Sequence, residues 1–276
     1  MMTVECMSDD QSPATLYSGD VARLFKVADK DEYKRARREF IRASDIDFRQ
    51  IADVGLRATM RCLFEEWFAY DRPVDESGTT PFDIIARALF ERDDGVCDRE
   101  YEDFREFSAT NFAAWFWIRD ASASSHCMTV ENMADGRDYE VYAGDFAARC
   151  DGARGGSMLV RIARPRGTWR MCGNPSVFMR EPSDEDGHRF LSEIIREWDP
   201  GFPELVGALF APHPGMMRRD GTRIGGAAAP SALRPVSVAT PYGDDPLPGT
   251  GPGADRGPKP RRRRRRRSSA DGTGRR

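Results

Sequence analysis

The arginines of this chain have the clearest chemical capacity, because a guanidinium group pairs with phosphate without needing a fold around it. A run of seven lies near the C-terminus and consists of Arg261, Arg262, Arg263, Arg264, Arg265, Arg266 and Arg267. Such a run indicates a disordered polycationic arm that binds nucleic acid or another polyanion, with released counterions supplying the free energy. The alternative interpretation is a terminal extension without a selected role.

A second group of arginines lies between residues 149 and 180, which hold seven arginines and a single acid, Asp151. The apolar alternation of this segment predicts that Arg161 and Arg170 point outward on neighbouring strands, with Arg166 in the turn between them. A basic patch on a small barrel is a plausible phosphate track. Alternatively, these arginines pair with acidic helices of the same molecule.

The charge of the chain is divided among three blocks. Residues 212–276 carry a net charge of +10, residues 149–180 carry +6, and the rest of the chain carries −19. This asymmetry bears on partners rather than on fold. It predicts RNA, DNA or another polyanion as a partner, with an acidic protein as the alternative.

Residues that could carry catalysis or hold a metal are poorly placed. The histidines are His126, His188 and His213, and the adjacent His126 and Cys127 point to opposite faces of a strand, which makes them a poor nucleophile–base pair. No cysteine pair has the short spacing of a zinc site. The chain also lacks the GxSxG, P-loop and GxGxxG motifs. We therefore expect no catalytic residue, no metal and no cofactor, with an enzyme of unrecognised site as the remaining alternative.

The aromatic segment Trp115-Phe116-Trp117 is a further candidate. Alternation sends Trp115 and Trp117 to one face of a strand and Phe116 to the other. An exposed pair could stack on nucleic-acid bases. Aromatic residues in a strand usually belong to the core, and we favour that interpretation.

Helical periodicity dominates the first half of the chain. Apolar residues at three- and four-residue steps predict helices over residues 28–43 and 46–70. Thr80 followed by Pro81 predicts the start of another helix, because a threonine caps well and proline fits the first turn. A short helix is predicted over residues 98–107.

The periodicity changes to that of strands after Asn111. Strands are predicted over residues 112–118, 127–132, 139–142, 157–164, 168–172 and 176–179. Asp135-Gly136 and Pro165-Arg166-Gly167 are turn signals between them. Helix returns after Ser183, and another apolar segment covers residues 203–210. From residue 211 onward Pro, Gly, Ala and Ser dominate, which indicates a segment that does not fold.

The order of these segments resembles the uncharacterised module that accompanies SEC-C motifs in many bacterial proteins. The likeness covers roughly residues 49–180 and depends on segments such as Leu63–Asp71, Thr80-Pro81-Phe82, Ala134–Val141 and Gly167-Thr168-Trp169. The SEC-C motif itself, a short metal-binding cluster rich in Cys and His, is absent from this chain. The resemblance therefore implies helices followed by strands, and it implies no zinc ligand and no catalytic residue.

Together these patterns predict an α+β chain. We expect a flexible N-terminus over residues 1–18, a helical part over 19–110, an antiparallel barrel-like or curled-sheet module over 111–181, a C-terminal helical segment over 182–211 and a disordered tail over 212–276. The scattered cysteines, and the lack of a signal or membrane-spanning segment, predict a cytoplasmic location. The predicted function is non-catalytic, non-specific binding of RNA or DNA, with a protein–protein adaptor as the alternative.

Overall fold

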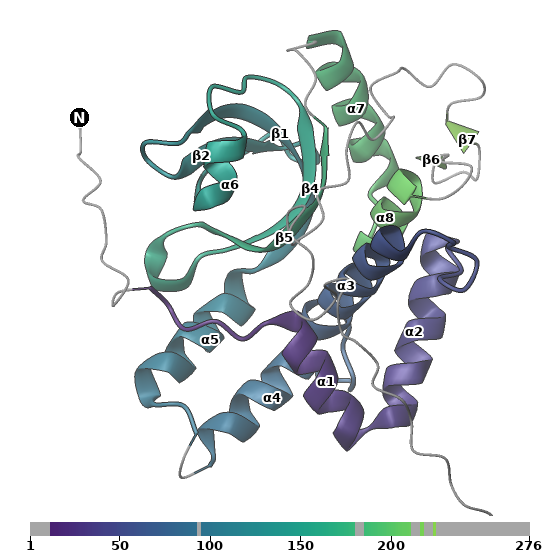
Figure 1. The fold of residues 1–276 in the computed structure, drawn as a ribbon, viewed down its shortest axis with the longest axis vertical. Coiled ribbons are helices and arrows are strands. Elements are labelled where there is room, and N and C mark those ends of the chain that lie inside the picture. The colour runs from purple at the N-terminus through teal and green to yellow at the C-terminus, as the bar shows by residue number, and fades with distance from the viewer. Residues whose placement is uncertain (1–11, 93–94, 180–184, 211–215, 218–222, 225–276) are drawn as a thin grey trace, which may run out of the picture. The chain divides into compact units, whose positions relative to one another are not determined.

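The fold is that of a computed structural model, in which residues 12–92, 95–179, 185–210, 216–217 and 223–224 are described (Figure 1). Its helices are α1 (Ser18–Ala28), α2 (Lys30–Ser44), α3 (Val54–Tyr70), α4 (Pro81–Phe90), α5 (Asp98–Thr110), α6 (Asp145–Arg149), α7 (Glu185–Trp198) and α8 (Phe202–Phe210). The strands of the main sheet are β1 (Phe112–Ser122), β2 (Cys127–Asn132), β3 (Asp138–Tyr142), β4 (Ser157–Ala163) and β5 (Arg170–Met179). Two short strands, β6 (Met216–Met217) and β7 (Arg223–Ile224), pair with each other.

The helix starts follow from capping residues. The Thr80 hydroxyl accepts from the backbone N–H of Asp83, whose carboxylate accepts in turn from the Thr80 N–H, as predicted for the start of α4. Helix α3 begins later than the predicted Ile46, because the Asp53 side chain accepts from the Leu56 N–H and caps the helix there. Helices α1 and α6 were not predicted from the sequence.

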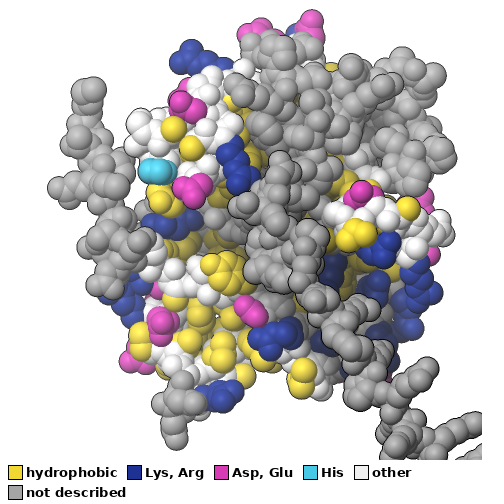
Figure 2. Space-filling view, viewed as in Figure 1, with side chains coloured by type: hydrophobic (Ala, Val, Ile, Leu, Met, Phe, Trp, Pro, Cys, Tyr) yellow, Lys and Arg dark blue, Asp and Glu magenta, His cyan; other side chains and the backbone are white. Residues whose placement is uncertain are grey.

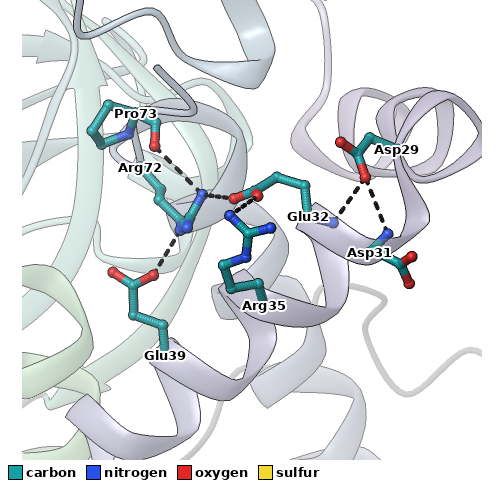
Figure 3. Close-up of polar contacts among 7 residues, drawn as sticks. All are labelled: Asp29, Asp31, Glu32, Arg35, Glu39, Arg72 and Pro73. Carbon is teal, nitrogen blue, oxygen red and sulfur yellow. Dashed lines mark hydrogen bonds and ion pairs between the residues drawn. The ribbon is translucent and has the colours of Figure 1, made fainter. Parts of the chain in front are cut away.

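An ion-pair group around Arg72 joins α2 to the segment that follows α3 (Figure 3). The Arg72 guanidinium donates to Glu32 at 2.5 Å and to Glu39 at 2.9 Å, both on α2. Asp29 caps the same helix by accepting from the backbone N–H groups of Asp31 and Glu32. Because the Arg72 and Glu32 side chains are each only 10% exposed, this pair helps to fix the orientation of α2.

The main sheet has the strand order β1-β2-β3-β5-β4, and β4 pairs again with β1. Four of these pairings are antiparallel, whereas β3 and β5 are parallel and meet at the single pair Tyr142↔Arg170. The prediction of helices followed by a sheet is confirmed for the described residues. The predicted antiparallel module is corrected at one pairing, since the parallel β3–β5 pair makes the sheet a mixed one.

Both predicted turns are present. Gly136, in the turn between β2 and β3, has a φ of +73°, which suits glycine. Residues Pro165–Gly167 form a single 3₁₀ turn between β4 and β5. The two strands predicted over 168–172 and 176–179 form one strand, β5. The predicted flexibility of residues 1–11 and of most of the tail lies outside the described residues.

Strand β4 separates two hydrophobic clusters. Met158, Val160 and Ile162 pack inside the sheet, where Phe116 and Ala147 of α6 also lie. Leu159 packs with residues of α1, α2, α3, α7 and α8. Because both faces of β4 are covered, all seven of its residues are buried.

The helices of the first half approach the sheet at several points. Helix α5 contacts β4 and the turn after it, α3 contacts β5, and α8 contacts β1 and lies against α2 (Figure 1). Gly207 allows α8 to come close to α2, since a Cβ there would lie 2.4 Å from the Ser44 carbonyl oxygen. This packing decides which outward-facing side chains of the sheet can reach solvent.

Candidate nucleic-acid interface

Arg161 lies on the face of β4 opposite Met158, Val160 and Ile162, as the alternation predicts. Its predicted outward exposure is wrong, because helices cover that face and the side chain is 0% exposed. Nε donates to Glu66 at 3.1 Å, Nη2 donates to Asp71 at 2.6 Å, and Nη1 donates to Asn111 at 2.6 Å. All three nitrogens therefore have partners within the molecule, which is the alternative that the sequence left open for the basic strands.

The Arg161 cluster contains one cation and two carboxylates. The pKa of Glu66 is raised to about 7, because the effect of burial, together with that of Asp71, exceeds the opposing effect of Arg161. Burial disfavours the charged form of Arg161, but Asp71 and Glu66 together raise its pKa above the ordinary value. Since Asp71 already compensates the guanidinium, Glu66 is the group whose ionisation is costly.

Arg166 is also held by acidic residues of a helix. Its guanidinium donates twice to the Asp103 carboxylate, from Nε at 2.7 Å and from Nη2 at 2.6 Å, and its backbone N–H donates to Glu106. The hydrogen bond with Asp103 raises the pKa of Arg166. The side chain is 25% exposed, so Arg166 attaches the β4–β5 turn to α5 while leaving part of its surface open.

Arg170 lies on a more open surface. Its guanidinium is 4.9 Å from the ring centre of Tyr142, a distance suited to a cation–π contact. Arg164 lies 6.0 Å from the ring of Trp169 and donates through Nε to the Gly167 carbonyl. We name these four residues, Tyr142, Arg164, Trp169 and Arg170, the arginine–aromatic surface.

The parallel meeting of β3 and β5 brings this surface together. Tyr142 is in register with Arg170, and the Tyr142 N–H donates to the Trp169 carbonyl at 2.9 Å. The β1–β2 loop joins at the same point, because the Ala143 N–H donates to the His126 carbonyl at 2.8 Å. Residues far apart in sequence thus meet at one end of the sheet.

The polar atoms of this surface are incompletely paired. Within the described part of the chain, the buried Nε of Arg170 and the buried Nδ1 of His126 have no hydrogen-bond partner. Arg164 is exposed, and Tyr142 is 41% exposed. Rings and guanidinium groups at the surface can stack on a base and contact a phosphate.

Acidic residues limit the basic character of this region. Asp138 and Glu140 are exposed on β3, where they alternate with Tyr139 and Val141. Burial raises the pKa of Cys127, Glu140 raises it further, and Arg170 opposes them. The neighbourhood therefore has mixed charge, because Tyr142 shares the exposed face of β3 with Asp138 and Glu140.

The aromatic segment of β1 belongs to the core. Trp115 is 2% exposed, Phe116 is 0% and Trp117 is 7%, so none of them can stack on a base. Trp115 and Trp117 pack on the helical side and Phe116 packs inside the sheet, which confirms the predicted alternation.

Several other predictions can be placed. The run Arg261–Arg267 lies outside the described residues. No helix in the described part of the chain could cross a membrane. Sequence reasoning missed Tyr142, Arg164 and Trp169 as site residues. Their signal was present, since Arg164 and Trp169 flank the predicted turn and Tyr142 ends a predicted strand.

Comparisons with protein-family models, with curated proteins and with solved structures found no significant match to this chain. The resemblance to the SEC-C-associated module therefore stays a prediction.

Proposed function

We propose that this chain is a non-catalytic protein that binds single-stranded nucleic acid through the arginine–aromatic surface, with the run Arg261–Arg267 adding non-specific phosphate contacts. The observation that carries the proposal is the pairing of Tyr142 with Arg170, which places two arginines and two aromatic rings at one end of the sheet. Stacking on rings and contact with phosphates need no base-specific hydrogen bonds. The binding is therefore tolerant of sequence.

The arrangement of the sheet supports this proposal. We infer that the five strands act as a barrel-like module, with the strand order, the parallel β3–β5 pair and the intervening helix α6 of an OB-fold. Proteins of that architecture bind oligonucleotides at the second and third strands and at the loops β1–β2 and β4–β5. A fold alone does not establish a function, so the site residues must be tested directly.

Charge decides how the two basic regions contribute. Residues 1–211 carry a net charge of −13, which disfavours a polyanion at long range, whereas residues 212–276 carry +10. The basic run supplies electrostatic attraction, and the arginine–aromatic surface supplies stacking. We expect both to be needed for binding near physiological ionic strength.

Changing both Arg164 and Arg170 to Gln should weaken binding of a fluorescent oligouridine of about 20 nucleotides. Loss of two phosphate contacts on a single strand should also flatten the slope of log K against log salt by about 1.4. Tyr142→Ala should cost about 1–3 kcal/mol if one base stacks on that ring. Fluorescence anisotropy measured at several salt concentrations gives both the affinity and the slope.

The matched control changes Arg149 and Arg154 to Gln. Both are exposed, both belong to the same basic segment, and the change in net charge is the same, but neither lies on the arginine–aromatic surface. An equal loss of affinity in the two double variants would mean that net charge alone, and not the arginine–aromatic surface, accounts for the loss. Undiminished binding by the Arg164/Arg170 variant would remove the site from consideration.

Changing Arg261, Arg262, Arg263, Arg264 and Arg265 to Gln in the full chain tests the basic run separately. If these residues contact phosphates, the salt slope for the same oligouridine should flatten by up to about 3.5. The loss should be similar for an oligoadenosine, because phosphate contacts position a ligand and do not specify its sequence. An unchanged slope would show that the run makes no contact with the bound strand.

A further inference from the structure

A cavity of about 360 Å³ lies between α4, α5 and the loop that precedes α4. Phe82 and Phe104 line it and are buried, at 2% and 4% exposure. Tyr101 also lines it and stacks on Phe90, with ring centres 4.2 Å apart and planes 6° apart. Hydrophobic side chains gather at the surface over α4 and α5 (Figure 2). The volume falls in the range of small-molecule sites, which is roughly 300–1,000 Å³.

The polar groups of the cavity differ in their need for a partner. Asp83 accepts from the Ser108 hydroxyl at 2.5 Å and from the Thr80 hydroxyl and N–H at 2.8 and 3.1 Å. These donors come from α5 and from the start of α4, so the Asp83 carboxylate is already satisfied within the protein. It has little remaining capacity to attract a cationic ligand.

Two arginines also line the cavity, one from each helix. Arg105 of α5 donates to Glu102 on its own helix at 2.9 Å. Arg87 of α4 is exposed and has no ion pair or side-chain hydrogen bond with any residue that the structure describes. The charged group available to pair with a ligand is therefore the Arg87 guanidinium, in a cavity that aromatic rings also line.

We propose that this cavity binds a small aromatic carboxylate. Its ring lies against Phe82, Phe104 and Tyr101, and its carboxylate pairs with Arg87. A guanidinium binds a carboxylate through two parallel hydrogen bonds, which favours a planar anion over a neutral molecule of the same shape. The site is separate from the arginine–aromatic surface, so it does not depend on the proposed nucleic-acid binding.

The test uses benzoate as the probe and benzamide as its neutral counterpart, with the full chain in a calorimetric titration. Benzoate should bind, and Arg87→Gln should weaken it by about tenfold or more, because a charge-assisted hydrogen bond is lost. Arg99→Gln is the matched control, since Arg99 is an exposed arginine of α5 that does not line the cavity. It should leave benzoate binding within about twofold, as expected for a distant surface charge.

A second variant keeps the test independent of charge. Ala109 is exposed and lines the cavity, so Ala109→Trp should fill it and abolish benzoate binding without unfolding the chain. Failure of benzoate to bind at about 10 mM, well above the range typical of specific small-molecule sites, would overturn the proposal. So would equal binding of benzamide, tighter binding of phenyl phosphate, or undiminished benzoate binding by Ala109→Trp.

Discussion

Replacing Arg161 with alanine is expected to lower the free energy of unfolding by about 3–5 kcal/mol, because it leaves buried carboxylates without their cation. Glu66 is 9% exposed and Asp71 is 29% exposed, and both now depend on the same guanidinium. The substitution also removes the contacts of that guanidinium with the rings of Tyr70 and Phe202. Urea denaturation followed by circular dichroism measures the loss.

Arg154→Ala is the control for this experiment. Arg154 is 81% exposed and its ion pair with Asp120 spans 3.5 Å, so its removal should cost no more than about 0.5 kcal/mol. The double variant Arg161→Met, Glu66→Gln should recover part of the loss, because it removes the cation together with one of its carboxylates. A cost below about 1 kcal/mol for Arg161→Ala would mean that the cluster relaxes or admits water.

The stability contributed by Glu66 should fall as pH rises from about 4.5 to about 7, and Glu66→Gln should remove that contribution. The pKa of Glu66 is about 7 in the fold and 4.5 in the unfolded chain, so between these values the folded state binds more protons. Stability contributed by the protonated group is complete below pH 4.5 and is lost as pH rises toward 7. The loss amounts to about 3 kcal/mol over this window.

The measurement is the difference in unfolding free energy between the natural chain and Glu66→Gln at several pH values. Taking the difference cancels the contributions of the other carboxylates. We expect the unfolding free energy of Glu66→Gln, relative to that of the natural chain, to rise steadily between pH 4.5 and 7. A flat difference would indicate that Arg161 holds Glu66 ionised at its ordinary pKa, and a difference of opposite sign would indicate a lowered pKa.

Local patterns in the sequence were sufficient to predict most of the elements. The Thr80-Pro81 start, the Asp135-Gly136 turn and the alternation in β4 act over a few residues, so the printed sequence contains them. Helix α1 lies almost entirely within the predicted helical part over 19–110, but the apolar spacing of Val21, Ala22 and Phe25 was not recognised as a separate helix. The parallel β3–β5 pair was missed because it joins segments that no short-range pattern links.

The site was harder to predict for the same reason. Alternation correctly placed Arg161 on the outward face of β4, but its partners Glu66 and Asp71 on that face lie 95 and 90 residues earlier in the chain. Arg170 was predicted as a site residue and Trp169 precedes it in the sequence, but Tyr142 becomes its neighbour only through the β3–β5 pairing. The count of charges identified the basic segment. Tertiary packing, however, determines which of its arginines form internal ion pairs and which lie at the surface.

The single register pair between Tyr142 and Arg170 has a mechanical consequence. A ring of strands opens first where the fewest backbone hydrogen bonds hold it, so local unfolding should begin between β3 and β5. A nucleic-acid strand that contacts residues of both β3 and β5 would favour the paired arrangement of these two strands. Binding would then stabilise the β3–β5 pair, so that local opening between these strands would be rarer and slower in the bound chain than in the free one.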